Sequence, residues 1–181
     1  MDRREFLTAG KRSGTAVPGI SKTEARTFSG LNVYNGPWTK NEVVHLLKRT
    51  MFGAKLSDIG YAIEQYTNSQ GKYGILQEYG GHGIGTEMHQ EPHVLNFGKA
   101  GNGPEIIPGF VLAIEPMITR GSARTKVLAD DWTVVSADKS RGSHFEHTYA
   151  ILPDGKPFVL TSFDGGKAEL ARLGVEVSEL L

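Results

Sequence analysis

The sequence predicts an α+β protein in which an antiparallel sheet carries helices on one face. Apolar residues recur at helical spacing mainly between about residues 38 and 71. From Ile75 onward they form short runs of β-type residues that are punctuated by glycine. Helices that precede an antiparallel sheet are typical of this class. A chain of 181 residues is long enough to bury the core of one such domain.

Two helices are predicted at the start of this region. The first, ahead of Gly53, has the capping-box spacing of Thr39 and Glu42, and Gly53 ends it. The second has Ser57 as its N-cap and closes at Gly71. Its predicted apolar face consists of Ile59, Ala62, Ile63 and Tyr66.

The second half of the chain predicts strands. The β-type runs are Phe110–Glu115, Trp132–Ser136, Phe145–Leu152 and Pro157–Thr161. A Pro-Asp-Gly-Lys turn at residues 153–156 joins the last two runs, so these are expected to form a hairpin. A short helix is expected at Lys167–Leu173.

The composition excludes several classes of protein. Lys plus Arg equals Asp plus Glu, at 20 each, so the formal net charge is zero and no nucleic-acid partner is expected. There is no cysteine, which excludes disulfides and leaves imidazole and carboxylate groups as metal ligands. No apolar run approaches the roughly 20 residues that span a bilayer, so no membrane partner is expected.

Residues 1–37 are predicted to be a disordered or loosely packed tail that could be deleted at little cost in stability. The segment RREFL at residues 3–7 resembles a twin-arginine export signal. An export signal also needs an apolar stretch of about 7–15 residues, whereas residues 8–14 are polar and basic. A cytoplasmic protein is therefore expected, with export as the weaker alternative.

Three motifs, GHGIG, IEP and FEHT, supply one imidazole and two carboxylates on strand-like segments. The candidate metal ligands are His82, Glu115 and Glu146. Neutral imidazole with hard oxygen ligands suits a divalent ion such as Mn, Fe, Co or Zn. Because ligands lie about 2.0–2.2 Å from such an ion, we expect the three side-chain ends within about 5 Å of one another.

Each candidate ligand has a structural alternative. The glycines around His82 indicate either a close approach of the backbone to a ligand or strand, or an ordinary exposed loop. Glu115 ends an apolar run and is expected to be half-buried, unless it reaches solvent. Glu146 is either a ligand or an exposed strand residue paired with Arg141 or Lys139.

Other residues are candidates for substrate contacts. A neutral His89 is suited to donate a hydrogen bond to a developing oxyanion, although a hydrogen bond to Glu87 or Glu91 is the structural alternative. Met88 and Trp132 either shape a pocket for a thioether side chain or belong to the core. Structural or supporting roles are predicted for His93, His144 and His147.

Taken together, GHGIG, MHQEP, AIEPM, DWTV and FEHT resemble the C-terminal half of a type I methionine aminopeptidase over about residues 56–164. That family has the pita-bread fold and uses two divalent ions to remove the N-terminal methionine of new polypeptides. The resemblance implies that Glu115 also transfers protons, that His89 stabilises the tetrahedral intermediate, and that Trp132 lines the methionine pocket or its rim. The metal ligands that it implies are His82, Glu115 and Glu146.

The family's dinuclear site uses two further aspartates from the N-terminal half. Upstream of His82 this sequence has only Asp2 and Asp58, and neither lies in a strand-like context. We therefore expect at most one weakly bound ion and little or no activity of the chain alone. The two hypotheses are a methionine aminopeptidase by relationship, with a peptide or nascent-chain N-terminus as substrate, and a non-catalytic pita-bread-derived binding or scaffolding module. The protein partner that such a chain would need is either a second copy of itself or the missing half of the enzyme.

Residues 1–55 resemble instead the opening of an uncharacterised bacterial family, on the strength of RREFL, GPW and HLLKRTMFGA. This predicts a chimera joined near residues 54–58. Its parts would be the tail of residues 1–37, a helical segment of different origin at residues 38–55, and the aminopeptidase-like half-domain of residues 56–181.

Overall fold

The structure, a computed structural model, describes residues 53–179. The predicted tail of residues 1–37, the export-like RREFL segment and the helix predicted ahead of Gly53 lie outside the described residues. The described part forms two helices and ten strands. In chain order these are α3 (Leu56–Gln70), β1 (Gly74–Ile75), β2 (Gly81–Gly83), β3 (Gln90–Val94), β4 (Val111–Ile114), β5 (Met117–Thr119), β6 (Thr125–Val127), β7 (Val134–Ser136), β8 (Gly142–His144), β9 (His147–Ile151), β10 (Pro157–Val159) and α4 (Lys167–Arg172).

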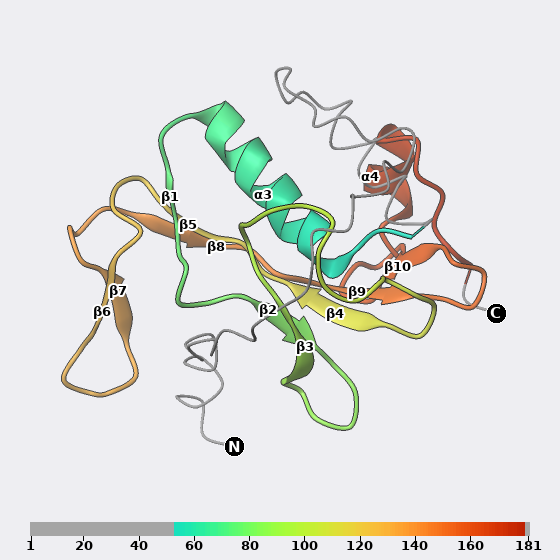
Figure 1. Ribbon diagram of the computed structural model, residues 1–181, viewed down its shortest axis with the longest axis horizontal. Helices are drawn as coiled ribbons and strands as arrows, with labels where there is room; N and C mark the ends of the chain where they lie inside the picture. Colours follow the sequence, from blue (N-terminus) through green and yellow to red (C-terminus); the bar gives the residue numbers. More distant parts are fainter. Residues whose placement is uncertain (1–52, 180–181) are drawn as a thin grey trace, which may run out of the picture. The chain divides into compact units, whose positions relative to one another are not determined.

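Five strands form the main sheet, in the order β10-β9-β4-β2-β3. A three-stranded sheet, β1-β5-β8, continues from it, because β4 runs into β5 across residues 115–116 and β8 runs into β9 across residues 145–146. β6 and β7 form a separate hairpin at the left of Figure 1. Every pair of strands is antiparallel, so the predicted type of sheet is confirmed.

Both helices pack on one face of the main sheet (Figure 1). The core beneath α3 includes Val94 of β3 and Leu112 of β4, and α4 contributes Leu170 to a second cluster with Val159 of β10. Leu112 pairs with Tyr149 and Tyr149 pairs with Val159, so both clusters lie on the same face. This confirms the predicted arrangement. The opposite face carries no helix from the described residues.

The start of α3 differs from the prediction. Asp58, rather than Ser57, satisfies the helix terminus, because its carboxylate accepts a hydrogen bond from the backbone N–H of Lys55 at 2.8 Å. A negative charge in the first turn also suits the helix dipole. The Ser57 hydroxyl accepts instead from the backbone N–H of Asn102, at 2.8 Å. The cap prediction for Ser57 was therefore wrong.

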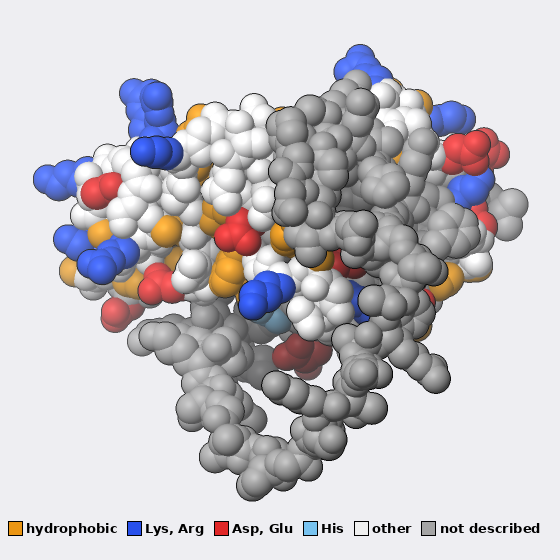
Figure 2. All heavy atoms as spheres, turned by 45° about the horizontal axis from the view of Figure 1, so that its top comes forward, with side chains coloured by type: hydrophobic (Ala, Val, Ile, Leu, Met, Phe, Trp, Pro, Cys, Tyr) orange, Lys and Arg blue, Asp and Glu red, His pale blue; other side chains and the backbone are white. Residues whose placement is uncertain are grey.

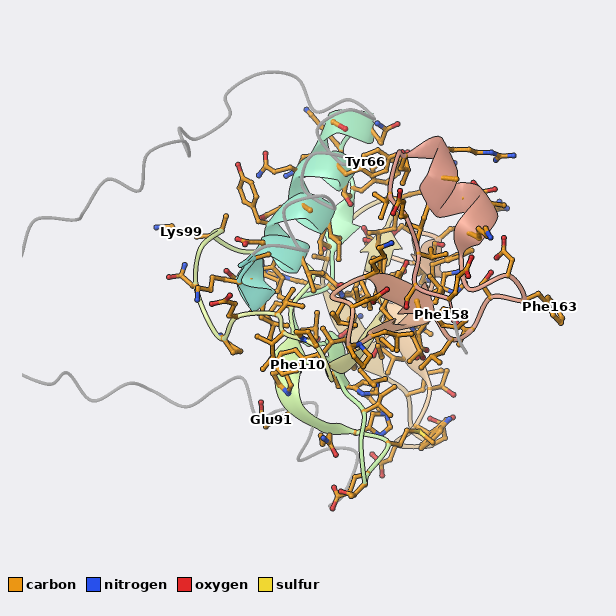
Figure 3. The ribbon with its side chains drawn as sticks, turned by 90° about the vertical axis from the view of Figure 1, so that its right-hand side faces the viewer. Tyr66, Glu91, Lys99, Phe110, Phe158 and Phe163 are labelled. Carbon is orange, nitrogen blue, oxygen red and sulfur yellow. The ribbon has the colours of Figure 1, made fainter. Side chains whose placement is uncertain are left out.

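The buried side of α3 is also rotated from the prediction. Ile59 packs against the core as expected. Tyr66, however, is 48% exposed (Figure 3), because the buried side runs through Gly60 and Thr67. A Cβ at Gly60 would lie 2.5 Å from the backbone oxygen of Leu95, so the helix approaches the chain after β3 too closely for any other residue.

The long β-type runs were predicted correctly, and the short strands were not. β4, β7, β9 and β10 fall inside the four predicted runs, and β9 and β10 form the predicted hairpin. α4 begins at Lys167, as expected. The strands that no run predicted have only two to five residues, so their alternation is too brief to detect.

Within residues 53–179 there are 16 Asp and Glu residues and 11 Lys and Arg residues, so the described part is acidic although the whole chain has zero net charge. On the face shown in Figure 2, basic and acidic side chains are interspersed, and both kinds lie on each side of the view. Phe163 projects away from the turn that precedes α4 (Figure 3). None of the described helices combines the length and apolar character that crossing a membrane requires.

The carboxylate of Asp138 ties two loops together. It accepts hydrogen bonds from the backbone N–H groups of Ser122, at 2.6 Å, and Ser140, at 3.0 Å. These bonds favour the ionised carboxylate and lower the pKa of Asp138 to about 2. They therefore link the loop after β5 to the turn between β7 and β8.

We expect Asp138 to make stability depend on pH in acid. Its folded-state pKa is depressed, so its contribution is present above the unfolded value near 3.8 and is lost as the pH falls toward 2. Thermal unfolding of the wild type and Asp138→Asn between pH 5 and pH 2 measures this. The difference in unfolding temperature should shrink across that interval, and a difference that stays constant would contradict the assignment.

Candidate metal centre

His82 occupies the middle of β2, between two glycines, and its side chain is buried. Its Nδ1 lies 3.0 Å from the backbone oxygen of Gly83. A carbonyl oxygen only accepts hydrogen bonds, so Nδ1 carries the proton and the Nε2 lone pair of the neutral ring is left to act as a ligand. That Nε2 lies 3.6 Å from Oε1 of Glu115.

The glycines beside His82 are required by close backbone contacts. A Cβ at Gly81 would lie 2.0 Å from the backbone oxygen of Ala113, and one at Gly83 would lie 2.4 Å from that of Glu91. Only glycine permits these distances between β2 and its two neighbours. The interpretation that glycine marks a close approach to another strand is confirmed, and the alternative of an ordinary exposed loop is wrong.

Glu115 and Glu146 lie opposite each other in one antiparallel ribbon. Ile114 pairs with His147 on one side of them and Met117 pairs with His144 on the other, so the register sets residue 115 against residue 146. Pro116 has no N–H to donate to the opposite strand, so only its oxygen takes part there, accepting from the backbone N–H of Phe145 at 3.2 Å. Directly opposed like charges destabilise a sheet, which points to a role for this pair other than stability.

Register also places His82 on the same face as the two carboxylates. His82 pairs with Ala113, which lies two residues before Glu115 and therefore on the same side of the strand. The shared face is the one opposite α3. The sequence predicts that the side-chain ends of the three candidate ligands lie close together. Nε2 of His82 lies 3.6 Å from Oε1 of Glu115, and ligand atoms of Glu115 and Glu146 lie within 4.8 Å of each other.

Glu115 is buried, more deeply than the sequence indicated, and the alternative in which it reaches solvent is wrong. Burial raises its pKa, and the nearby charge of Glu146 raises it further, while His82 and His144 oppose the shift. Nε2 of His144 lies 3.0 Å from Oε2 of Glu115. The two imidazoles thus approach different oxygens of one carboxylate.

Asn96 holds the backbone of Glu115 in place. Its fully buried side chain donates a hydrogen bond from Nδ2 to the backbone oxygen of Glu115 at 3.0 Å. This bond satisfies a carbonyl at the point where β4 ends, ahead of Pro116. The Oδ1 atom of Asn96 is buried without a hydrogen-bond partner among the described residues.

The predicted substrate-contact residues are dispersed. His89 lies beside the ligands, with its ring centroid 4.3 Å from that of His82. Met88 is 71% exposed, so its alternative core role is wrong. Trp132 is 66% exposed and belongs to the turn between β6 and β7, a hairpin that stands apart from β2 and β4 in Figure 1. A core role is wrong for Trp132 as well.

Two of the histidines that had been predicted as supporting residues differ in their surroundings. His93 pairs with His82 across β2 and β3, and burial lowers its pKa. His147 lies on the helix-covered face, and its Nδ1 is 2.8 Å from the hydroxyl oxygen of Thr161. Only His93 of these two shares a face with the ligand cluster.

His144, for which the sequence analysis predicted a structural or supporting role, lies among the candidate ligands. Together with Glu115 and Glu146 it offers ligand atoms that all lie within 4.8 Å of one another, the only such group within residues 53–179. The signal was its position two residues before Glu146, which puts both side chains on one side of an extended chain.

The donor set fits a divalent ion. A buried carboxylate opposite a second carboxylate needs a cation or hydrogen-bond donors, and imidazole with carboxylate is a common ligand set for Zn, Mn, Fe and Co. An α+β domain with such a ligand set on the face of its antiparallel sheet opposite the described helices is of the kind found in metal-dependent hydrolases.

The comparisons with known proteins identify the family. Residues 40–153, more than half of the chain, match metallopeptidase family M24, so the chain belongs to this family. The match begins at residue 40 rather than at 56, so the similarity is not confined to the part after the predicted join. Membership implies a divalent metal.

The relatives are named methionine aminopeptidases. The chain is 45% identical over 123 residues to one from Clostridium acetobutylicum, covering 68% of this chain and 48% of the relative. It is 38% identical over 156 residues to one from Clostridium perfringens, covering 82% and 61%. The chain thus spans about half the length of the curated relatives it matches.

The solved structures that this chain resembles are also methionine aminopeptidases. The chain resembles the crystal structure of methionine aminopeptidase from Rickettsia prowazekii with a TM-score of 0.58 and 37% identity, over 67% of this chain and 50% of that one. The Thermotoga maritima enzyme gives the same TM-score and identity, over 65% and 48%. The fold is therefore of the pita-bread type, as predicted.

Proposed function

We propose that the chain forms the metal-binding half of a methionine aminopeptidase-type site, which would act on the N-terminal residue of a peptide only once the two missing carboxylate ligands are supplied. The observation that supports this is the buried carboxylate of Glu115, which lies between two imidazoles and opposite Glu146. Because an opposed pair of carboxylates costs stability without a cation, metal binding accounts for it better than structure does.

Each residue has a distinct part in this function. The metal ligands are His82, Glu115 and Glu146. When bound, a divalent ion polarises a scissile carbonyl and lowers the pKa of a bound water. Glu115 accepts a proton from the attacking water and returns it to the leaving amine. His89 donates a hydrogen bond to the carbonyl oxygen as it becomes anionic, and the exposed Met88 contacts the methionine side chain.

The same proposal includes a limit on activity. Of the two aspartates upstream of His82, Asp58 caps α3 and also accepts a hydrogen bond from the backbone N–H of Gly101, so it is committed to structure. Without two further carboxylates the chain holds one ion weakly, since loss of even a supporting partner weakens a site about 10–100-fold. Trp132 as the rim of the methionine pocket is part of this proposal. A separate origin for residues 40–55 is not supported, because the family match includes them.

The test is hydrolysis of a Met-Gly-type peptide by the purified chain at saturating Co or Mn. We expect no turnover above that of Glu115→Ala, together with weak binding of a single ion by calorimetry. His147→Gln is the control, because it changes an imidazole on the opposite face. Robust turnover that Glu115→Ala abolishes would overturn the expected inactivity and indicate ligands from a second copy or a complementing chain. Absence of any metal binding would overturn the metal site itself.

A non-catalytic peptide-binding or scaffolding module is the second candidate. Met88 and Phe145, next in sequence to His89 and Glu146, are both at least 70% exposed, as is common on interaction surfaces. Binding of a fluorescent methionyl peptide distinguishes the two functions: affinity that survives EDTA and Glu115→Ala would favour the module. For either function we assign the chain to the cytoplasm, where new polypeptides begin.

A further inference from the structure

His144 shares its face with the candidate ligands. It is the last residue of β8 and lies two residues before Glu146, which is opposed to Glu115. His144 is therefore the diagonal cross-strand neighbour of Glu115, within reach of a long side chain. Its side chain is 50% exposed, so its rotamer can adjust.

The two separations between an imidazole and Glu115 are close to those of ligands that share one ion. Two ligands at about 2.1 Å from an ion lie roughly 3.0–3.4 Å apart when they subtend octahedral or tetrahedral angles. Nε2 of His144 lies 3.0 Å from one oxygen of Glu115, and Nε2 of His82 lies 3.6 Å from the other. Glu115, His144 and Glu146 offer ligand atoms within 4.8 Å of one another, and His82 joins this group through Glu115. The side chains of His144 and Glu146 are exposed, so they can rotate toward an ion.

Charge leads to the same conclusion. Glu115 and Glu146 together carry two negative charges, which one divalent cation balances, and two neutral imidazoles complete four ligands without adding charge. Without a cation, His144 only donates a hydrogen bond to a carboxylate that His82 also faces.

We propose that His144 is itself a metal ligand, which gives this chain a set of two imidazoles and two carboxylates. The proposal rests on the proposed metal-binding function and extends it to a residue outside the family motif. A second nitrogen ligand favours Co, Zn or Fe over Mn, which prefers oxygen-rich sites.

Proton NMR of the full chain loaded with Co²⁺ counts the imidazole ligands, because each coordinated ring gives a paramagnetically shifted, exchangeable N–H signal. We expect two signals from the wild type. His144→Gln should leave one and weaken Co²⁺ binding by about 10–100-fold or more. His147→Gln, three residues away on the opposite face, should keep both signals and the wild-type affinity.

The outcomes separate this inference from the proposed function. A single wild-type signal that persists in His144→Gln and disappears in His82→Gln would overturn the role of His144 and leave the metal site intact. No Co²⁺ binding by the wild type would overturn both. The wild-type count does not depend on whether any variant folds.

Discussion

Glu115→Gln is expected to abolish stabilisation by a divalent cation and to raise the unfolding temperature of the cation-free chain. The wild type buries a carboxylate that opposes Glu146, and glutamine removes this repulsion while keeping the shape of the side chain. In the wild type, a cation at a hundred times its Kd stabilises the fold by about 3 kcal/mol. That corresponds to roughly 5–10 °C for a chain of this size.

Thermal unfolding in EDTA and in Co²⁺, followed by circular dichroism, measures both effects. Glu105→Gln is the control, since this carboxylate pairs with Lys55 at the surface and its loss should change little. An equal cation-dependent shift in Glu115→Gln and the wild type would show that the cation binds elsewhere. A lower unfolding temperature of Glu115→Gln in EDTA would show that the carboxylate stabilises the fold by itself.

Gly81→Ala is expected to destabilise the chain by about 3 kcal/mol or more, because the new methyl group has no space. The Cβ would lie 2.0 Å from the backbone oxygen of Ala113 and 3.2 Å from the Cβ of Val94. The first of these contacts is with backbone, which cannot rotate away. β2 would have to separate from β4, and His82 would leave Glu115.

Urea unfolding of Gly81→Ala and Gly142→Ala gives a matched comparison. A Cβ at Gly142 would meet its nearest atom, the backbone oxygen of Ile118, at an ordinary 3.5 Å, so that variant should stay within about 0.5 kcal/mol of the wild type. Similar losses in the two variants would mean that the contact between β2 and β4 is looser than described.

Prediction from the sequence succeeded where a pattern is local and long enough to repeat. The run that became β4 and the turn that joins β9 to β10 were recognisable from apolar β-type residues and from Pro-Asp-Gly-Lys. It failed at the cap of α3, where two adjacent residues could both accept from an N–H. Only the fold decided that Ser57 bonds to Asn102 and that Lys55 is the N-cap residue, whose backbone N–H donates to Asp58.

The sequence by itself determined the chemistry available to the site: one imidazole among glycines and two carboxylates, each in a motif of the family. The tertiary structure alone decided how they meet. The pairing of β4 with β9 and of β5 with β8 sets Glu115 against Glu146 and brings His144 to the same face. No local pattern encodes this register, because Pro116 interrupts the ribbon at that point, and a shift of one residue would turn these side chains to the opposite face.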